Sequence, residues 1–153
     1  MSRVDTATFL TREREPILQA AAESLGRMHV RHYDAAGTEA VEKRLRALFD
    51  QLANAVERRD LGPMIAYAER IAEERYTAGY DLSEVQIAFN ALEEASWSRV
   101  LTALDPAQLS EALGLISTVL GAGKDALARR YVSLAADVRA PSLDLSALFA
   151  GTG

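Results

Sequence analysis

The sequence contains no cysteine among its 153 residues, and only 7% of them are aromatic. It therefore has no disulfide, no thiolate ligand for zinc or an iron–sulfur cluster, and no thiol nucleophile, which fits a reducing cytoplasm. No run approaches the ~18 apolar residues that a membrane-spanning helix needs, and no apolar segment of signal-peptide length follows Met1. We therefore expect a cytoplasmic protein that does not associate with a membrane.

Positive charge is also scarce, because 17 Lys and Arg stand against 22 Asp and Glu, for a net charge of −5. A net negative charge opposes nonspecific attraction to phosphate backbones and to anionic lipid surfaces. Nucleic acid is therefore a poor candidate partner.

Residues that break helices are few, with 9 Gly and 4 Pro, whereas Ala, Leu, Glu and Arg are abundant. Alternating strand-like runs bounded by turn residues are missing. The sequence predicts an all-α single-domain bundle of five to six helices over residues 1–139, followed by a C-terminal tail over 140–153.

Capping residues and prolines mark the expected helix starts. Asp5 or Thr6 caps a first helix, which we expect to end or kink at Pro16, and a second helix follows to about Met28. After a glycine turn at Gly37, a further helix opens at Thr38.

Later starts follow the same logic. Pro63 sits at a first helical position, and the helix it opens is closed by Gly79. Asp81 and Glu84 have the spacing of a capping box, and the inward face of their helix extends as far as Trp97 and Leu101.

The last helix begins at the sequence Asp105-Pro106 and runs to about Val138. At 1.5 Å per residue this is about 50 Å, longer than the ~30 Å diameter of a small domain, so the helix must kink at Gly121–Gly123 or project. Its exposed apolar positions would need cover from a partner. The interface residues that we expect on this helix are Leu120, Leu127, Tyr131 and Leu134.

Groups that support chemistry are sparse. His29 and His32 are three residues apart, but two ligands do not make a metal or haem site, so we expect no cofactor and no metal. Glutamates between residues 69 and 94 alternate with arginines at helical spacing, which is typical of an exposed ion-paired face. The glycine-rich GAGKDA at 121–126 has no strand before it and is no phosphate loop.

Aromatic residues from neighbouring helices are the best candidates for lining a small-molecule pocket. These candidates are Tyr67, Tyr76, Phe89 and Trp97. Core filling is the alternative, and the commoner role of such residues.

The tail holds Leu145, Leu148 and Phe149 within a few residues of each other, after a helix-stopping Pro141. One short helical turn would bring these three side chains to one side, which suits docking into a groove of a partner protein. Folding back onto the domain as a lid is the alternative.

Residues 70–104 carry an arginine-bearing helix, a glycine turn and a capped helix, with Gly79, Asp81, Glu84, Phe89 and Trp97 among the distinctive positions. This pattern resembles the N-terminal sensor domain of the RsbT co-antagonist (RsbR-type) proteins of the bacterial stressosome and similar modules of PucR-type regulators. The resemblance implies a globin-like fold without haem, a homodimer, and a signal-input role without catalytic residues. The STAS domain that usually follows in this family is not part of this sequence.

These observations favour a non-enzymatic regulatory domain that binds a protein partner and a small ligand, and that forms a homodimer. A structural bundle adaptor without a ligand is one alternative. A small helical enzyme using the carboxylates of residues 69–94 is the other.

Overall fold

A computed structural model of the chain describes residues 5–28 and 37–139. Within these ranges the chain forms α-helices and no strand, which confirms the predicted all-α class and helix number. The helices are α1 (Thr6–Arg12), α2 (Arg14–Met28), α4 (Thr38–Arg58), α5 (Gly62–Thr77), α6 (Leu82–Ala103) and α7 (Pro106–Arg139).

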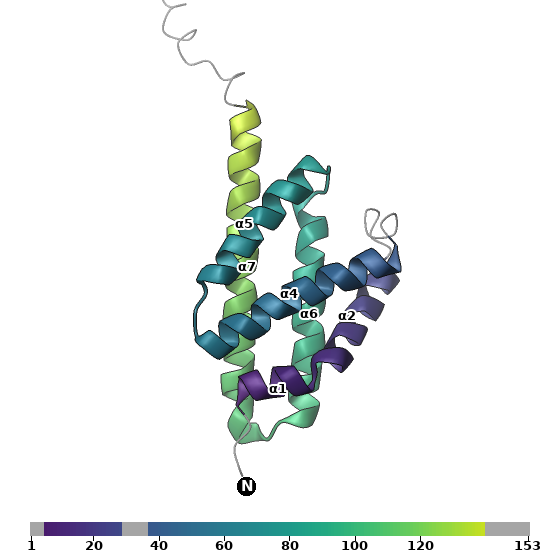
Figure 1. The fold of residues 1–153 in the computed structure, drawn as a ribbon, viewed down its shortest axis with the longest axis vertical. Helices are drawn as coiled ribbons and strands as arrows, with labels where there is room; N and C mark the ends of the chain where they lie inside the picture. Colours follow the sequence, from purple (N-terminus) through teal and green to yellow (C-terminus); the bar gives the residue numbers. More distant parts are fainter. Residues whose placement is uncertain (1–4, 29–36, 140–153) are drawn as a thin grey trace, which may run out of the picture.

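The helices form two groups that cross each other (Figure 1). α6 and α7 run antiparallel and pack together, and α1, α2, α4 and α5 cross them on one side. α5 packs mainly on α7, and α2 packs mainly on α6. α4 contacts each of the other five described helices and lies across the middle of the bundle.

Predicted caps are found at several helix ends. The Asp5 carboxylate accepts a hydrogen bond of 2.7 Å from the Thr8 backbone N–H at the start of α1. The Glu84 carboxylate accepts one of 3.2 Å from the Asp81 backbone N–H at the start of α6. Gly79, at φ +86°, makes the turn that separates α5 from α6, a conformation that glycine adopts without strain.

The predicted break at Pro16 lies three residues too late. α1 ends at Arg12, Glu13 is the turn residue, and Pro16 lies within the first turn of α2. Proline is tolerated there because the first helical N–H groups have no intrahelical acceptor. Arg99 of α6 donates to the Glu13 carboxylate, whose side chain is only 13% exposed, with its nearest nitrogen 2.8 Å away. This ion pair fixes the α1–α2 corner on α6.

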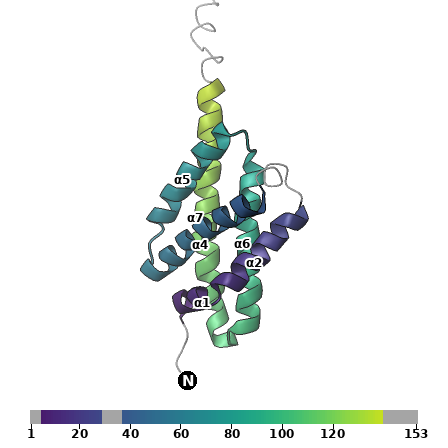
Figure 2. The same ribbon diagram turned by 45° about the vertical axis from the view of Figure 1, so that its right-hand side comes forward.

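α7 is one continuous helix of 34 residues. It does not break at Gly121–Gly123 but projects beyond α5 at its C-terminal end, as Figures 1 and 2 show from two directions. Projection was one of the two outcomes that its length predicted.

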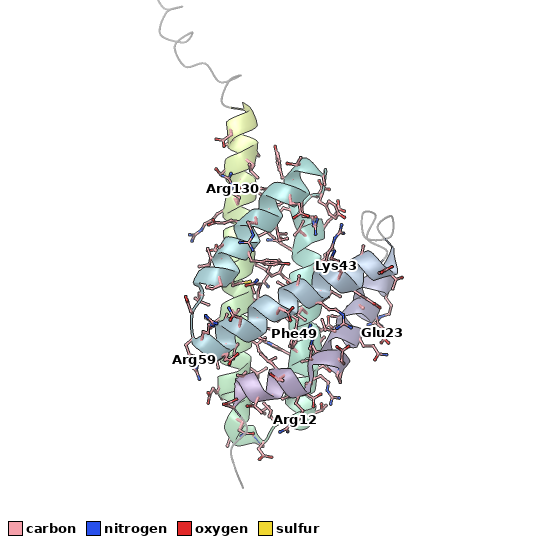
Figure 3. All side chains as sticks on the ribbon, in the orientation of Figure 1. Arg12, Glu23, Lys43, Phe49, Arg59 and Arg130 are labelled. Atoms are coloured by element: carbon pink, nitrogen blue, oxygen red, sulfur yellow. The ribbon has the colours of Figure 1, made fainter. Side chains whose placement is uncertain are left out.

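The core lies where the two groups of helices cross. Phe49 of α4 sits in it at 1% exposure, near the middle of the bundle in Figure 3. The largest fully buried side chains are Phe9, Leu10, Ile17, Leu45, Phe49, Leu52, Met64, Phe89, Leu92, Ile116, Leu120 and Leu127.

Two predicted inward positions are wrong. Trp97 is 40% exposed and Leu101 is 59% exposed. Both follow the helical spacing of α6, but α2 and α7 pack mainly on other sides of that helix, and the described part of the chain leaves this face open. Spacing alone does not reveal which side of a helix its neighbours cover.

Candidate functional site

The four aromatic residues predicted to line a pocket differ in their burial and position. Tyr67 and Tyr76 are half-buried on α5, Phe89 is 2% exposed in the core, and Trp97 lies on the open side of α6. Neither cavity described below is lined by any of them. Tyr76 instead packs edge-on against Tyr131, with ring centroids 5.7 Å apart.

Three of the predicted interface residues of α7 belong to the core of this chain. Leu120 and Leu127 are fully buried, and Tyr131 is 7% exposed. Their side chains are therefore already covered by this chain. Leu134 is half-buried on the projecting part of α7. Leu145, Leu148 and Phe149 lie outside the described residues.

A tyrosine between two arginines joins α4, α5 and α6. The Arg44 guanidinium donates a 2.7 Å hydrogen bond to the Tyr80 hydroxyl and lies 5.5 Å from the centre of its ring. The Arg75 guanidinium lies at the same distance from that ring and donates to the Glu74 carboxylate at 2.9 Å. Such contacts between a guanidinium and an aromatic face stabilise by about 0.5–2 kcal/mol each.

Arg75 is 8% exposed and is the one charged residue among the buried side chains of the described part of the chain. The sequence did carry a signal for it, because Ala68, Ala72 and Arg75 continue one inward-facing stripe of α5. An arginine at such a position is buried unless its neighbours leave the stripe open.

Burial also affects the tyrosines beside this group. It raises the pKa of Tyr131 to about 12. It raises the pKa of Tyr67 as well, against the opposing effect of the nearby Arg75 charge. Both side chains therefore remain protonated at neutral pH.

An open face is formed by α6 and α7 together. Trp97 and Leu101 lie one turn apart on it, on the α6 side. Lys124 of α7 donates a 3.0 Å hydrogen bond to Asn90 of α6, so this edge of α7 borders the exposed side of α6. On α7, nothing lies within 4 Å of a Cβ built on Gly114 or on Gly121.

A cavity of about 530 Å³ lies between α2 and α4. Its apolar lining comes from Leu18, Ala22 and Leu45. Its polar lining is unevenly charged, because it has one arginine and three glutamates. The complete lining is Glu15, Leu18, Gln19, Ala22, Glu23, Thr38, Glu42, Leu45 and Arg46.

One end of this cavity is electrically balanced. Arg46 donates two hydrogen bonds, of 2.8 and 3.0 Å, to the two carboxylate oxygens of Glu15. The Arg46 hydrogen bonds lower the pKa of Glu15, which keeps the pair ionised. No local pattern in the sequence indicates this cavity, because its shape depends on the angle at which α2 and α4 cross.

A smaller hollow of about 280 Å³ lies between α5 and α7. It is lined by Ile65, Glu69, Ala122, Asp125, Ala126, Arg129, Arg130 and Ser133. Glu73 of α5 forms an ion pair of 2.9 Å with Arg130, so at least one of the carboxylates considered for catalysis is part of an exposed ion-paired surface.

No group of three or more metal-ligating side chains occurs in residues 5–28 and 37–139, and His29 and His32 lie outside them. Within the same ranges, no helix has the length and apolarity required to cross a membrane.

Comparison with known proteins gives a family for this arrangement. The family described as the RsbT co-antagonist protein rsbRD N-terminal domain matches residues 12–143. No match was found among curated proteins or among solved structures. The matched region contains α2, α4, α5, α6 and α7, including the turn at Gly79 and the open face of α6. The chain therefore belongs to the family of the N-terminal domain of RsbT co-antagonist proteins, which are helical regulatory domains.

Proposed function

We propose that this chain is a cytoplasmic, non-enzymatic input domain of a stressosome-type signalling pathway. It works as a homodimer, held together through the open face of α6 and α7, and it passes a signal to a protein partner. The observation that carries the proposal is the family match over residues 12–143.

The exposed pair Trp97 and Leu101 supports the proposed dimer face. Large apolar side chains on a surface mark contact sites when they cluster, and burying each contributes about 1.5–3 kcal/mol. A twofold axis near this face would bring two copies of the same patch together, as an isologous dimer requires.

The glycines beside this patch support the same face. Glycine inside a helix costs about 1 kcal/mol relative to alanine. Gly123 is explained within the chain, because a Cβ there would lie 2.8 Å from Cε1 of Phe89. Gly114 and Gly121 have open space instead. A second copy packing closely on α7 would explain these two glycines.

The projecting end of α7 suits the output role. It continues from the bundle as one uninterrupted helix, with Val132 66% exposed. α7 packs along α5 and α6 inside the bundle and projects beyond them. It can therefore transmit a movement of the bundle to a protein that contacts its projecting end.

The test measures the mass of the purified protein by light scattering at tens of micromolar. We expect the mass of two chains, and of one chain for the variant Trp97→Asp/Leu101→Asp. The control is Met28→Asp, because Met28 is also a large exposed apolar residue, 45% exposed, but lies on α2 and not on α6 or α7. A wild-type protein with the mass of one chain contradicts the proposed dimer, and a dimer that survives the double substitution contradicts its location.

A further inference from the structure

The cavity between α2 and α4 combines an apolar floor with unbalanced negative charge on both walls. Leu18 of α2 and Leu45 of α4 are 5% and 1% exposed and form part of the floor. Its volume of about 530 Å³ lies within the range of about 300–1,000 Å³ that is usual for small-molecule sites.

Two further glutamates of this lining, Glu23 and Glu42, are exposed and are not part of the Glu15–Arg46 ion pair. Glu23 accepts a long hydrogen bond of 3.4 Å from Gln19, and no ion pair between described residues involves Glu23 or Glu42. They stand on opposite walls, one on α2 and the other on α4.

The single arginine of the lining cannot balance all three of its glutamates. Arg46 is held by both oxygens of Glu15, and its charge also acts on Glu42 one turn earlier in α4, so the three glutamates and one arginine of the lining leave two negative charges in excess. Lys43 is exposed and, in Figure 3, lies on the side of α4 away from α2. Glu23 lies on α2, below α4 in the same view. A cavity whose lining carries an excess of one charge above an apolar floor concentrates ligands of the opposite charge.

We propose that the α2–α4 cavity binds an aliphatic polyamine, with methylene groups on Leu18, Ala22 and Leu45 and ammonium groups at Glu23 and Glu42. A simple metal cation would not use the apolar floor, and an uncharged apolar ligand would leave two carboxylates partly desolvated without a partner. A polyamine has ammonium groups separated by methylene chains, so it can contact both the carboxylates and the apolar floor of this lining.

A signalling role for polyamine binding rests on the proposed function, whereas the binding itself does not. Polyamine binding is measured by calorimetry and the dimer by light scattering, so either proposal can fail while the other stands.

The experiment titrates spermidine into the full chain by isothermal calorimetry at moderate ionic strength. We expect saturable binding of one spermidine per chain, and a loss of affinity of at least about tenfold in Glu23→Gln/Glu42→Gln. The matched control is Glu57→Gln/Glu94→Gln, which removes two exposed carboxylates outside the cavity and the same net charge. Its affinity should change less than about twofold.

A second variant tests the cavity without changing its charge. Ala22→Leu places a larger side chain at a half-buried position of the lining and should also reduce affinity by at least about tenfold, while circular dichroism shows an intact fold. Undetectable binding, binding that does not saturate, equal losses in the two carboxylate double variants, or full affinity in Ala22→Leu would each overturn the proposal.

Discussion

The hydroxyl of Tyr131 in α7 donates a hydrogen bond to the backbone carbonyl of Tyr80, with the two oxygens 3.3 Å apart. Tyr80 lies in the turn between α5 and α6, and Tyr131 lies next to Arg130, near the point where α7 leaves the bundle (Figure 3). Because Arg44 of α4 donates to the hydroxyl of the same Tyr80, one residue connects the exit of α7 to α4. The α2–α4 cavity includes Leu45 and Arg46 of that same helix.

The first prediction concerns this hydrogen bond. Tyr131→Phe keeps the ring and its contact with Tyr76 but removes the donor, which should lower the free energy of unfolding by about 0.5–1.5 kcal/mol in a urea titration. Tyr76→Phe is the control, because no hydrogen bond to its hydroxyl is found in the described part of the chain. Equal stability of Tyr131→Phe and the wild type would show that the bond contributes nothing.

Alkaline pH gives a second prediction from the same residue. Burial raises the pKa of Tyr131 from 10.0 to about 12, so the unfolded chain loses this proton at lower pH than the folded chain does. The stabilisation is present below pH 10.0 and is lost as pH rises towards 12. Urea unfolding across this range should therefore show a smaller loss of stability in Tyr131→Phe than in the wild type. Tyr67, whose pKa burial also raises, is present in both proteins and does not affect the difference.

Two glycines of α7, two residues apart, should respond to alanine in opposite directions. A Cβ at Gly123 would lie 2.8 Å from Phe89 and 3.0 Å from Met64, so Gly123→Ala should destabilise the fold by about 1–3 kcal/mol. At Gly121 nothing lies within 4 Å, so alanine should raise the free energy of unfolding by up to about 1 kcal/mol.

The same pair also tests the proposed dimer face. If Gly121 lets a second copy approach, Gly121→Ala should weaken the dimer in a dilution series, measured by light scattering, even though it stabilises each chain. A more stable chain with an unchanged dimer would place the contact elsewhere. The stability measurement is made at a concentration where both proteins are monomeric, so that dissociation does not enter it.

The helices were predictable because their boundaries are set locally. Asp5, Gly79 and Pro106 each act within a few residues, through a cap, a positive φ or a missing donor, and the structure uses all three as the sequence predicts. The error at Pro16 has a different origin, since a proline can end a helix or lie in its first turn, and tertiary contacts such as the Glu13–Arg99 ion pair help to decide between the two.

The sites were less predictable because they depend on how helices cross. Trp97 has the spacing of a core residue, but among the described helices none covers its side of α6 enough to bury it. Leu120 and Leu127 have the apolar character of interface residues, but both side chains point into the core of this bundle and are fully buried there. The lining of the α2–α4 cavity combines residues from two helices whose angle no local pattern encodes.

The last prediction concerns the tail, residues 140–153, which lies outside the described residues. Its apolar residues Leu145, Leu148 and Phe149 have the spacing of a short docking segment, and we expect them to bind a partner protein rather than this domain. Removing residues 141–153 should then change the free energy of unfolding by less than about 0.5 kcal/mol, while a pull-down with the truncated protein loses a partner that the full chain retains. Leu145→Ala/Leu148→Ala/Phe149→Ala should lose the same partner, which separates the apolar contact from the length of the chain. The alternative is that the tail covers this domain as a lid; the hollow between α5 and α7, close to the end of α7, is one surface that it could cover. Truncation should then lower the free energy of unfolding by several kcal/mol, about 1.5–3 for each large side chain that loses its burial, and leave the set of partners unchanged.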